Sequence, residues 1–311
     1  MLRLSAFMLM AASCAASATD IIATPEIFSP GVISGPAHES SISFMPDGKT
    51  AFFDRGKPPN ASVILVSHKV DGAWSEPTIA PFSGTWLDHD PVMAPDGSYL
   101  VFASNRPGAS DKPEDKGGLW RVDRKGEGWG EPWRLPQTVN ASSQTYAPSI
   151  AGDGSLYFIR FAADGSHIFR SQYKDGNYQE AVQQALGEAG AHPEDPAIAP
   201  DESFVVFGCD DPAKPDAPDR LFIAFREGDH WGKPTDLGDA INADSKPSDA
   251  HLGPDGRTLY YSSSWTSRWS YPRTPAQAEQ DLARMDSWDD GVSNIWSVSL
   301  APWLDGHAAK P

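Results

Sequence analysis

A short turn of the form Pro-Asp-Gly between two apolar strands recurs along this chain and constrains its fold more than any other feature. In the clearest copy, residues 95–97 form the turn, Pro91-Val92-Met93 precede it and Tyr99-Leu100-Val101 follow it. Asp and Gly tolerate the backbone conformation that a tight reversal between antiparallel strands requires. The turn aspartates are Asp47, Asp96, Asp153, Asp201 and Asp255. Their spacing of roughly fifty residues is typical of the blades of a β-propeller.

A third apolar segment follows each hairpin and is predicted to form a third strand. These segments are residues 63–66, 119–122, 167–170, 221–224 and 294–298. The first four are followed by a Gly-containing turn that ends in an aromatic residue: Trp74, Trp129, Tyr178 or Trp231. A short segment comes next, usually introduced by Pro, and this pattern favours an edge strand that does not use every backbone N–H.

The fifth unit ends near Leu300 after only three strands, and its fourth strand is predicted at the other end of the chain. Residues 25–30 resemble the Glu-Pro segments that follow Trp74 and Trp129. Pairing the two ends in one sheet closes the ring and removes an open edge. We therefore predict an all-β propeller of five four-stranded blades over residues 19–311, with a sixth blade if one unit is too degenerate to recognise.

These units resemble the PD40, or WD40-like, repeats of the TolB-type propellers. The resemblance rests on the strand-Pro-Asp-Gly-strand core and on Ser104-Asn105-Arg106-Pro107-Gly108, and it covers nearly all of residues 19–311. The chain departs from the pattern at Gly152, which replaces Pro, and at Glu202, which replaces Gly. The resemblance implies a fold rather than one activity, because such propellers serve as periplasmic scaffolds, ligand binders and appendages to hydrolases.

Residues 1–18 are predicted to be a secretory signal peptide. Arg3 supplies a positive charge, residues 4–12 an apolar run and Ala16-Ser17-Ala18 a cleavage site. The apolar run is too short to cross a bilayer, so no transmembrane segment is expected. We expect a periplasmic or extracellular protein; the alternative is a lipoprotein modified at Cys14, because Ala-Ala-Ser-Cys loosely resembles a lipoprotein box.

The formal net charge of −17 at pH 7 argues against some partners. Binding to a phosphate backbone needs clustered Lys and Arg, so nucleic acid is not expected as a partner. Anionic membrane surfaces are repelled for the same reason. We expect a monomer whose partner is a peptide, a protein or a glycan.

A recurring position near the start of each first strand carries three carboxylates. It lies six residues before each turn aspartate and is occupied by Ser41, Asp90, Ala147, Asp195 and Asp249. Three carboxylates at one level of a five-fold ring predict a site for a hard cation such as Ca²⁺. The alternative is that the aspartates accept hydrogen bonds from backbone N–H groups and hold neighbouring blades together.

The largest departure from the repeat is the insertion at residues 264–292 in the last blade, which contains Trp265 and Trp269. Thr274-Pro275-Ala276-Gln277 predicts a capping box that starts a helix from Pro275 to about Met285. Excursions of this length are usually functional or disordered. Strand order places the insertion on the face opposite the Asp-Gly turns, and we call that face the funnel face.

Three functions fit these features. The first is a non-catalytic binding protein that recognises a peptide or glycan on the funnel face, with the insertion as a lid. Its predicted ligand contacts are Asp90, Asp195, Asp249, Arg106, Trp265 and Trp269, although the two tryptophans could equally serve only to pack the insertion. The second is a glycan hydrolase that uses two of the aspartates as acid and base. Against it, repeat-equivalent aspartates are expected to have similar pKa values, whereas an acid and a base need different ones. The third is an assembly partner that binds through its aromatic turns.

Overall fold

The computed structural model describes residues 23–57, 61–108, 117–187, 190–210, 217–243, 246–264 and 271–308. The interpretations of residues 1–18, Cys14, Trp265 and Trp269 lie outside these residues. Within the described part, no helix has the length and apolar character needed to cross a bilayer.

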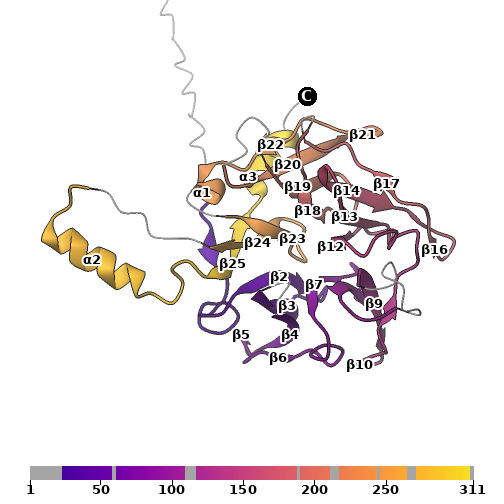
Figure 1. The fold of residues 1–311 in the computed structure, drawn as a ribbon, viewed down its shortest axis with the longest axis horizontal. Coiled ribbons are helices and arrows are strands. Elements are labelled where there is room, and N and C mark those ends of the chain that lie inside the picture. The colour runs from indigo at the N-terminus through magenta and orange to yellow at the C-terminus, as the bar shows by residue number, and fades with distance from the viewer. Residues whose placement is uncertain are drawn as a thin grey trace, which may run out of the picture.

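Five antiparallel blades surround a central axis and confirm the predicted five-bladed propeller (Figure 1). The strands are named below from the axis outward. Blade 1 contains β2 (Glu39–Phe44), β3 (Thr50–Lys57), β4 (Ala61–Val70) and β6 (Thr78–Ile79); blade 2 contains β7 (Asp88–Met93), β8 (Tyr99–Ser104), β9 (Leu119–Lys125) and β11 (Trp133–Arg134). Blade 3 contains β12 (Thr145–Ile150), β13 (Leu156–Ala162), β14 (Gly165–Ser171) and β17 (Val182–Gln183); blade 4 contains β18 (Glu194–Ile198), β19 (Phe204–Cys209), β20 (Arg220–Glu227) and β22 (Thr235–Asp236). Blade 5 contains β23 (Ser248–Leu252), β24 (Thr258–Ser264), β25 (Ser293–Ser299) and β1 (Glu26–Ile27).

Short two-residue strands mark the aromatic turns after the third strands. They are β5 (Ala73–Trp74), β10 (Gly128–Trp129), β15 (Tyr173–Lys174) with β16 (Asn177–Tyr178), and β21 (His230–Trp231). Apolar side chains fill all five interfaces between blades, so the core is a ring of inter-blade clusters.

The N-terminal strand completes the last blade, as predicted. β1 pairs antiparallel with β25, and Glu26 lies opposite Ser297. The N–H of Phe28 donates to the carbonyl of Ile295 at 2.8 Å. The Phe28 ring also bridges blades 5 and 1, because it lies edge-on, at centroid distances between 5.1 and 5.8 Å, against Phe44, Trp74 and Tyr260. The ring of blades is therefore closed by both hydrogen bonds and aromatic packing.

A β-bulge interrupts the first strand of every blade at the recurring position identified in the sequence. The pairing register shifts there in all five blades. The residue at the bulge has a φ between 48° and 52° in each case: Ser41, Asp90, Ala147, Asp195 and Asp249. Asp is among the few non-glycine residues that enter this left-handed region readily. The bulge therefore gives a conformational reason for aspartate to recur there.

The helix in the insertion, α2 (Pro275–Met285), begins at the predicted capping box. The Thr274 side chain accepts from the N–H of Gln277, and the Gln277 side chain accepts from the N–H of Thr274. No residue of α2 is buried, and the helix stands away from the blades (Figure 1). In this structure α2 does not cover the channel, which differs from the expected lid.

Two further helices were not anticipated from the sequence. α1 (Asp239–Asn242) lies in the connection from blade 4 to blade 5. α3 (Ala301–Ala308) follows β25 and packs Trp303 and Leu304 against the apolar cluster between blades 4 and 5. α3 therefore covers a part of the core where the sequence predicted no further element.

Candidate functional site

The three recurring aspartates meet at the axis. They line a cavity of about 10 Å³ together with residues from all five first strands: Ser41, Asp90, Ala147, Pro148, Asp195, Pro196, Asp249, Ala250 and His251. A volume of this size holds about one water molecule. The structure thus brings together Asp90, Asp195 and Asp249, and it leaves no room between them for a larger group.

Two of the three aspartates hold neighbouring blades together. Asp90 Oδ2 accepts from the N–H of Ala147 at 3.0 Å, and Asp195 Oδ2 accepts from the N–H of Asp249 at 2.9 Å. Serines link two other pairs of blades: the N–H of Met93 in blade 2 donates to Ser43 in blade 1, and the N–H of Ile198 in blade 4 donates to Ser149 in blade 3. These hydrogen bonds are the ones expected if the aspartates hold neighbouring blades together, which was the alternative to a cation site. Among the described residues no group of three or more His, Cys, Asp or Glu is arranged to hold a metal, and Ca²⁺ at this level stays a prediction.

His89 makes the electrostatic surroundings of Asp90 different from those of Asp195 and Asp249. His89 Nδ1 lies 3.1 Å from Asp90 Oδ2. Burial opposes ionisation of Asp90, but the charge and hydrogen bond of His89 and the N–H of Ala147 outweigh it and lower the pKa of Asp90 to about 2. Burial likewise opposes a charge on His89, but Asp90 raises the pKa of His89 to about 9. The pair is therefore an ionised pair at neutral pH.

The pKa values of the other buried carboxyl and imidazole groups near the axis shift in the opposite directions. Burial, followed by the charge of Asp249, raises the pKa of Asp195 well above its usual value. Burial and the charge of Asp90 raise the pKa of Asp54 to about 7, and burial raises that of Asp249. Burial also lowers the pKa of His251 to about 4, so this imidazole is neutral. The expectation of similar pKa values at repeat-equivalent aspartates is wrong for Asp90, because His89 has no counterpart beside Asp195 or Asp249.

A row of aromatic rings runs outward from Asp90 and was missed in the sequence. The rings of His89 and Tyr146 lie 5.6 Å apart, and those of Tyr146 and Phe161 lie 6.1 Å apart. These residues stand at the starts of β7 and β12 and at the end of β13, so strand direction places all three on the funnel face. Phe161 is 39% exposed although it is a large apolar residue. We call His89, Tyr146 and Phe161 the aromatic row.

Arg106 lies in a buried ion pair rather than at the axial cavity. Its guanidinium donates to both oxygens of Asp88, at 2.7 and 3.2 Å, and to the carbonyl of Phe82. The same group lies 4.8 Å from the centroid of the Phe102 ring. Arg106 and Trp86 line a separate cavity of about 290 Å³ near the edge of blade 2. A ligand contact for Arg106 stays a prediction, but its observed partners are structural.

No protein-family profile and no curated protein sequence matches the chain. Solved structures with a similar fold include the following three. The catalytic domain of the GH62 α-L-arabinofuranosidase of Coprinopsis cinerea has a TM-score of 0.52 and 15% identity, over 89% of this chain and 97% of that chain. A thermostable family-43 glycoside hydrolase has a TM-score of 0.52 and 12% identity, over 76% of this chain and 86% of that chain. A putative TolB from Agrobacterium tumefaciens has a TM-score of 0.48 and 15% identity, over 76% of this chain and 74% of that chain. At these identities the two hydrolases show a shared fold and nothing about the reaction.

Proposed function

We propose that this protein is an exported propeller of PD40 repeats that binds a peptide or a glycan on its funnel face. The observation that carries the proposal is the aromatic row beside the ionised Asp90. Flat rings offer apolar faces for sugar rings or side chains, and a fixed charge orients the ligand. Export rests on the predicted signal segment at residues 1–18. Ca²⁺ at the axial aspartates belongs to the same proposal, and it would have to compete with the amide hydrogen bonds of Asp90 and Asp195.

The size of the axial cavity favours binding over hydrolysis. A glycosidase holds its two carboxyl groups roughly 5–9.5 Å apart, on either side of the scissile bond. The cavity between Asp90, Asp195 and Asp249 is about 10 Å³, which is too small for a sugar ring. A ligand therefore lies above the aspartates, along the aromatic row, and not between them.

One observation favours the alternative, a hydrolase that acts on glycans. The pKa of Asp90 is lowered while that of Asp195 is raised, and a general base and a general acid need this kind of difference. A screen of aryl glycosides with the wild type and with Asp195→Asn separates the two proposals. Turnover by the wild type that the variant loses would establish the hydrolase and overturn the non-catalytic reading.

Binding is tested by shortening the aromatic row. Tyr146→Ala and Phe161→Ala are each expected to weaken binding by about 3- to 10-fold, the usual effect of losing one stacked ring. The probes are immobilised arabino- and cello-oligosaccharides and a peptide library, with binding measured by biolayer interferometry. Trp133→Ala is the matched control, because Trp133 is 40% exposed but lies on the edge strand β11 of blade 2. If the control loses as much binding as the row variants, the row is not the site.

A further inference from the structure

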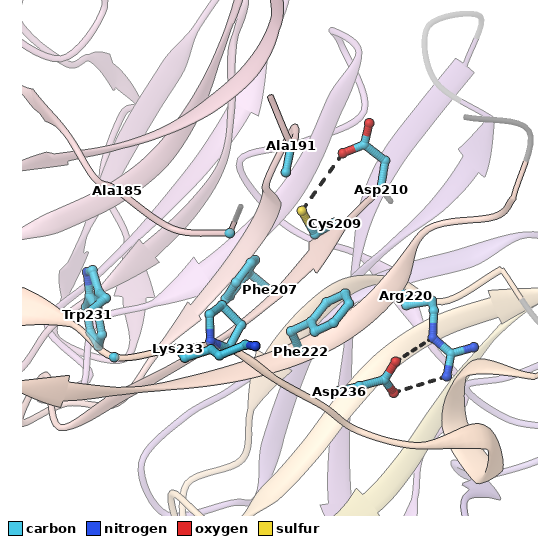
Figure 2. A pocket seen from close by; sticks show the side chains of 13 residues that line it. Ala185, Ala191, Phe207, Cys209, Asp210, Arg220, Phe222, Trp231, Lys233 and Asp236 are labelled. Carbon is cyan, nitrogen blue, oxygen red and sulfur yellow. Dashed lines mark hydrogen bonds and ion pairs between the residues drawn. The ribbon is translucent and has the colours of Figure 1, made fainter. Parts of the chain in front are cut away.

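A cleft opens on the flank of the propeller between the outer edge of blade 3 and the face of blade 4. Its volume is about 940 Å³, which is in the range of sites for small organic ligands. Phe207 and Phe222 lie side by side at its centre with Lys233 next to them (Figure 2). Trp231 borders one end, and the ion pair of Arg220 with Asp236 borders the other.

A substitution in blade 3 explains why the cleft exists. In four blades the residue after the edge strand donates its N–H to a carbonyl of the third strand, at 2.8–3.0 Å; these residues are Ala80, Leu135, Gln184 and Leu237. The three apolar ones are at most 2% exposed and act as a wedge against the next blade. Gln184 is polar and half-buried, and its Oε1 accepts instead from Trp231 Nε1 at 3.3 Å. Blade 3 thus has a polar residue at the wedge position. Leu186 and Phe207 still fill the interface beneath it, but Phe222 at the rim stays partly exposed.

The charges in the cleft favour an anion. Asp236 is paired with Arg220 at 2.6 Å, and Asp210 is paired with His192 at 2.7 Å, so both carboxylates already have a basic partner. Lys233 has no ion pair within the part of the chain that the structure describes. The channel mouth, in contrast, gathers carboxylates in a protein of net charge −17. An anionic ligand is therefore repelled at the channel mouth and accommodated in the cleft.

We propose that this cleft is a second ligand site, separate from the aromatic row, for a small organic anion with a flat ring system. The ring system packs on Phe222, which is partly exposed and is backed by the fully buried ring of Phe207, and a carboxylate pairs with Lys233. Aromatic side chains supply most of the contact area in such sites, and one charged group fixes the orientation. The two proposals fail independently, because the aromatic row lies on the funnel face and shares no residue with the cleft.

The class of ligand is tested with three fluorescent probes that share a ring and a linker and differ in charge: 1-pyrenebutyrate, 1-pyrenebutanol and 1-pyrenebutylamine. Titration of the wild type is expected to show one site that binds the butyrate about fivefold more tightly than the alcohol, and the amine least tightly. Lys233→Gln is expected to remove the difference between the acid and the alcohol. Equal binding of all three probes to the wild type would contradict the proposed anion preference.

The location is tested by filling the cleft. Ala185 is exposed at its wall, so Ala185→Trp should block the cleft without disturbing the core and weaken 1-pyrenebutyrate about tenfold or more. Val70→Trp is the control, because Val70 is 60% exposed on blade 1 and does not line the cleft. Binding of 1-pyrenebutyrate that Ala185→Trp leaves unchanged, or that Val70→Trp weakens as much, would overturn the site.

Discussion

Asp88→Ala is expected to lower the free energy of unfolding by about 3–5 kcal/mol, because it leaves the Arg106 guanidinium buried without its counter-charge. The Asp88 side chain is fully buried and that of Arg106 is 10% exposed. Asp88 also accepts from Ser83 at 2.8 Å and from Ser104 at 2.7 Å, so the substitution leaves several buried donors without an acceptor. Urea denaturation followed by tryptophan fluorescence measures the loss.

The control for this prediction is an ion pair of similar length at the surface. Arg257 and Asp305 lie 2.6 Å apart, but their side chains are 48% and 69% exposed. Solvent screens such a pair, so Asp305→Ala is expected to cost at most about 1 kcal/mol. Equal losses for Asp88→Ala and Asp305→Ala would mean that the Arg106 pair is not the buried anchor that the structure shows.

The stability of the protein is expected to fall as the pH rises from about 6.5 to about 9. Asp90 raises the pKa of His89 from 6.5 to about 9 in the folded protein, so the folded state holds this proton more tightly than the unfolded state. The contribution is complete below pH 6.5 and is lost by pH 9. Asp54 also makes the stability fall as the pH rises, but over the lower range from pH 3.8 to about 7, because its pKa is raised from 3.8 to about 7 in the folded protein. The shift at His89 corresponds to at most about 3 kcal/mol.

Substitution of His89 isolates this effect. In His89→Gln, the free energy of unfolding measured by urea denaturation is expected to decline less between pH 7 and 9 than in the wild type. His230→Gln is the control, because His230 is 67% exposed and its removal should leave the decline as in the wild type. If His89→Gln shows the wild-type decline, the pairing of His89 with Asp90 does not control the stability of the channel mouth.

The fold was predictable because its determinants are local and repeated. Each turn such as Asp96-Gly97 specifies a hairpin from adjacent residues, and the similar spacings between the five turns indicate a propeller. The closing strand was predictable because residues 25–30 repeat a pattern that occurs elsewhere in the chain. The start of α2 at Thr274 was predictable because a capping box needs only four consecutive residues.

The site was less predictable because its residues meet only in three dimensions. His89, Tyr146 and Phe161 come from three strands of two blades. His89 and Tyr146 occupy the same position of the repeat, but that position carries no aromatic ring in the other blades and does not point to Phe161. The pKa values of Asp90 and Asp195 shift in opposite directions because His89, which has no histidine counterpart in the other blades, lowers that of Asp90, whereas burial and the charge of Asp249 raise that of Asp195. The signal in the sequence is thus a departure from the repeat, and Gln184 in the flank cleft is another example.

Closure of the ring by the N-terminal strand is the central claim, and a disulfide across β1 and β25 tests it most directly. Glu26 lies opposite Ser297, and paired residues of antiparallel strands have Cα separations that suit a disulfide. Glu26→Cys combined with Ser297→Cys is expected to cross-link nearly completely under mild oxidation, as read by peptide mapping. Glu26→Cys combined with Ser299→Cys, two residues out of register, is expected to cross-link poorly. Failure of the first pair, or equal cross-linking of both pairs, would contradict a propeller closed in this register.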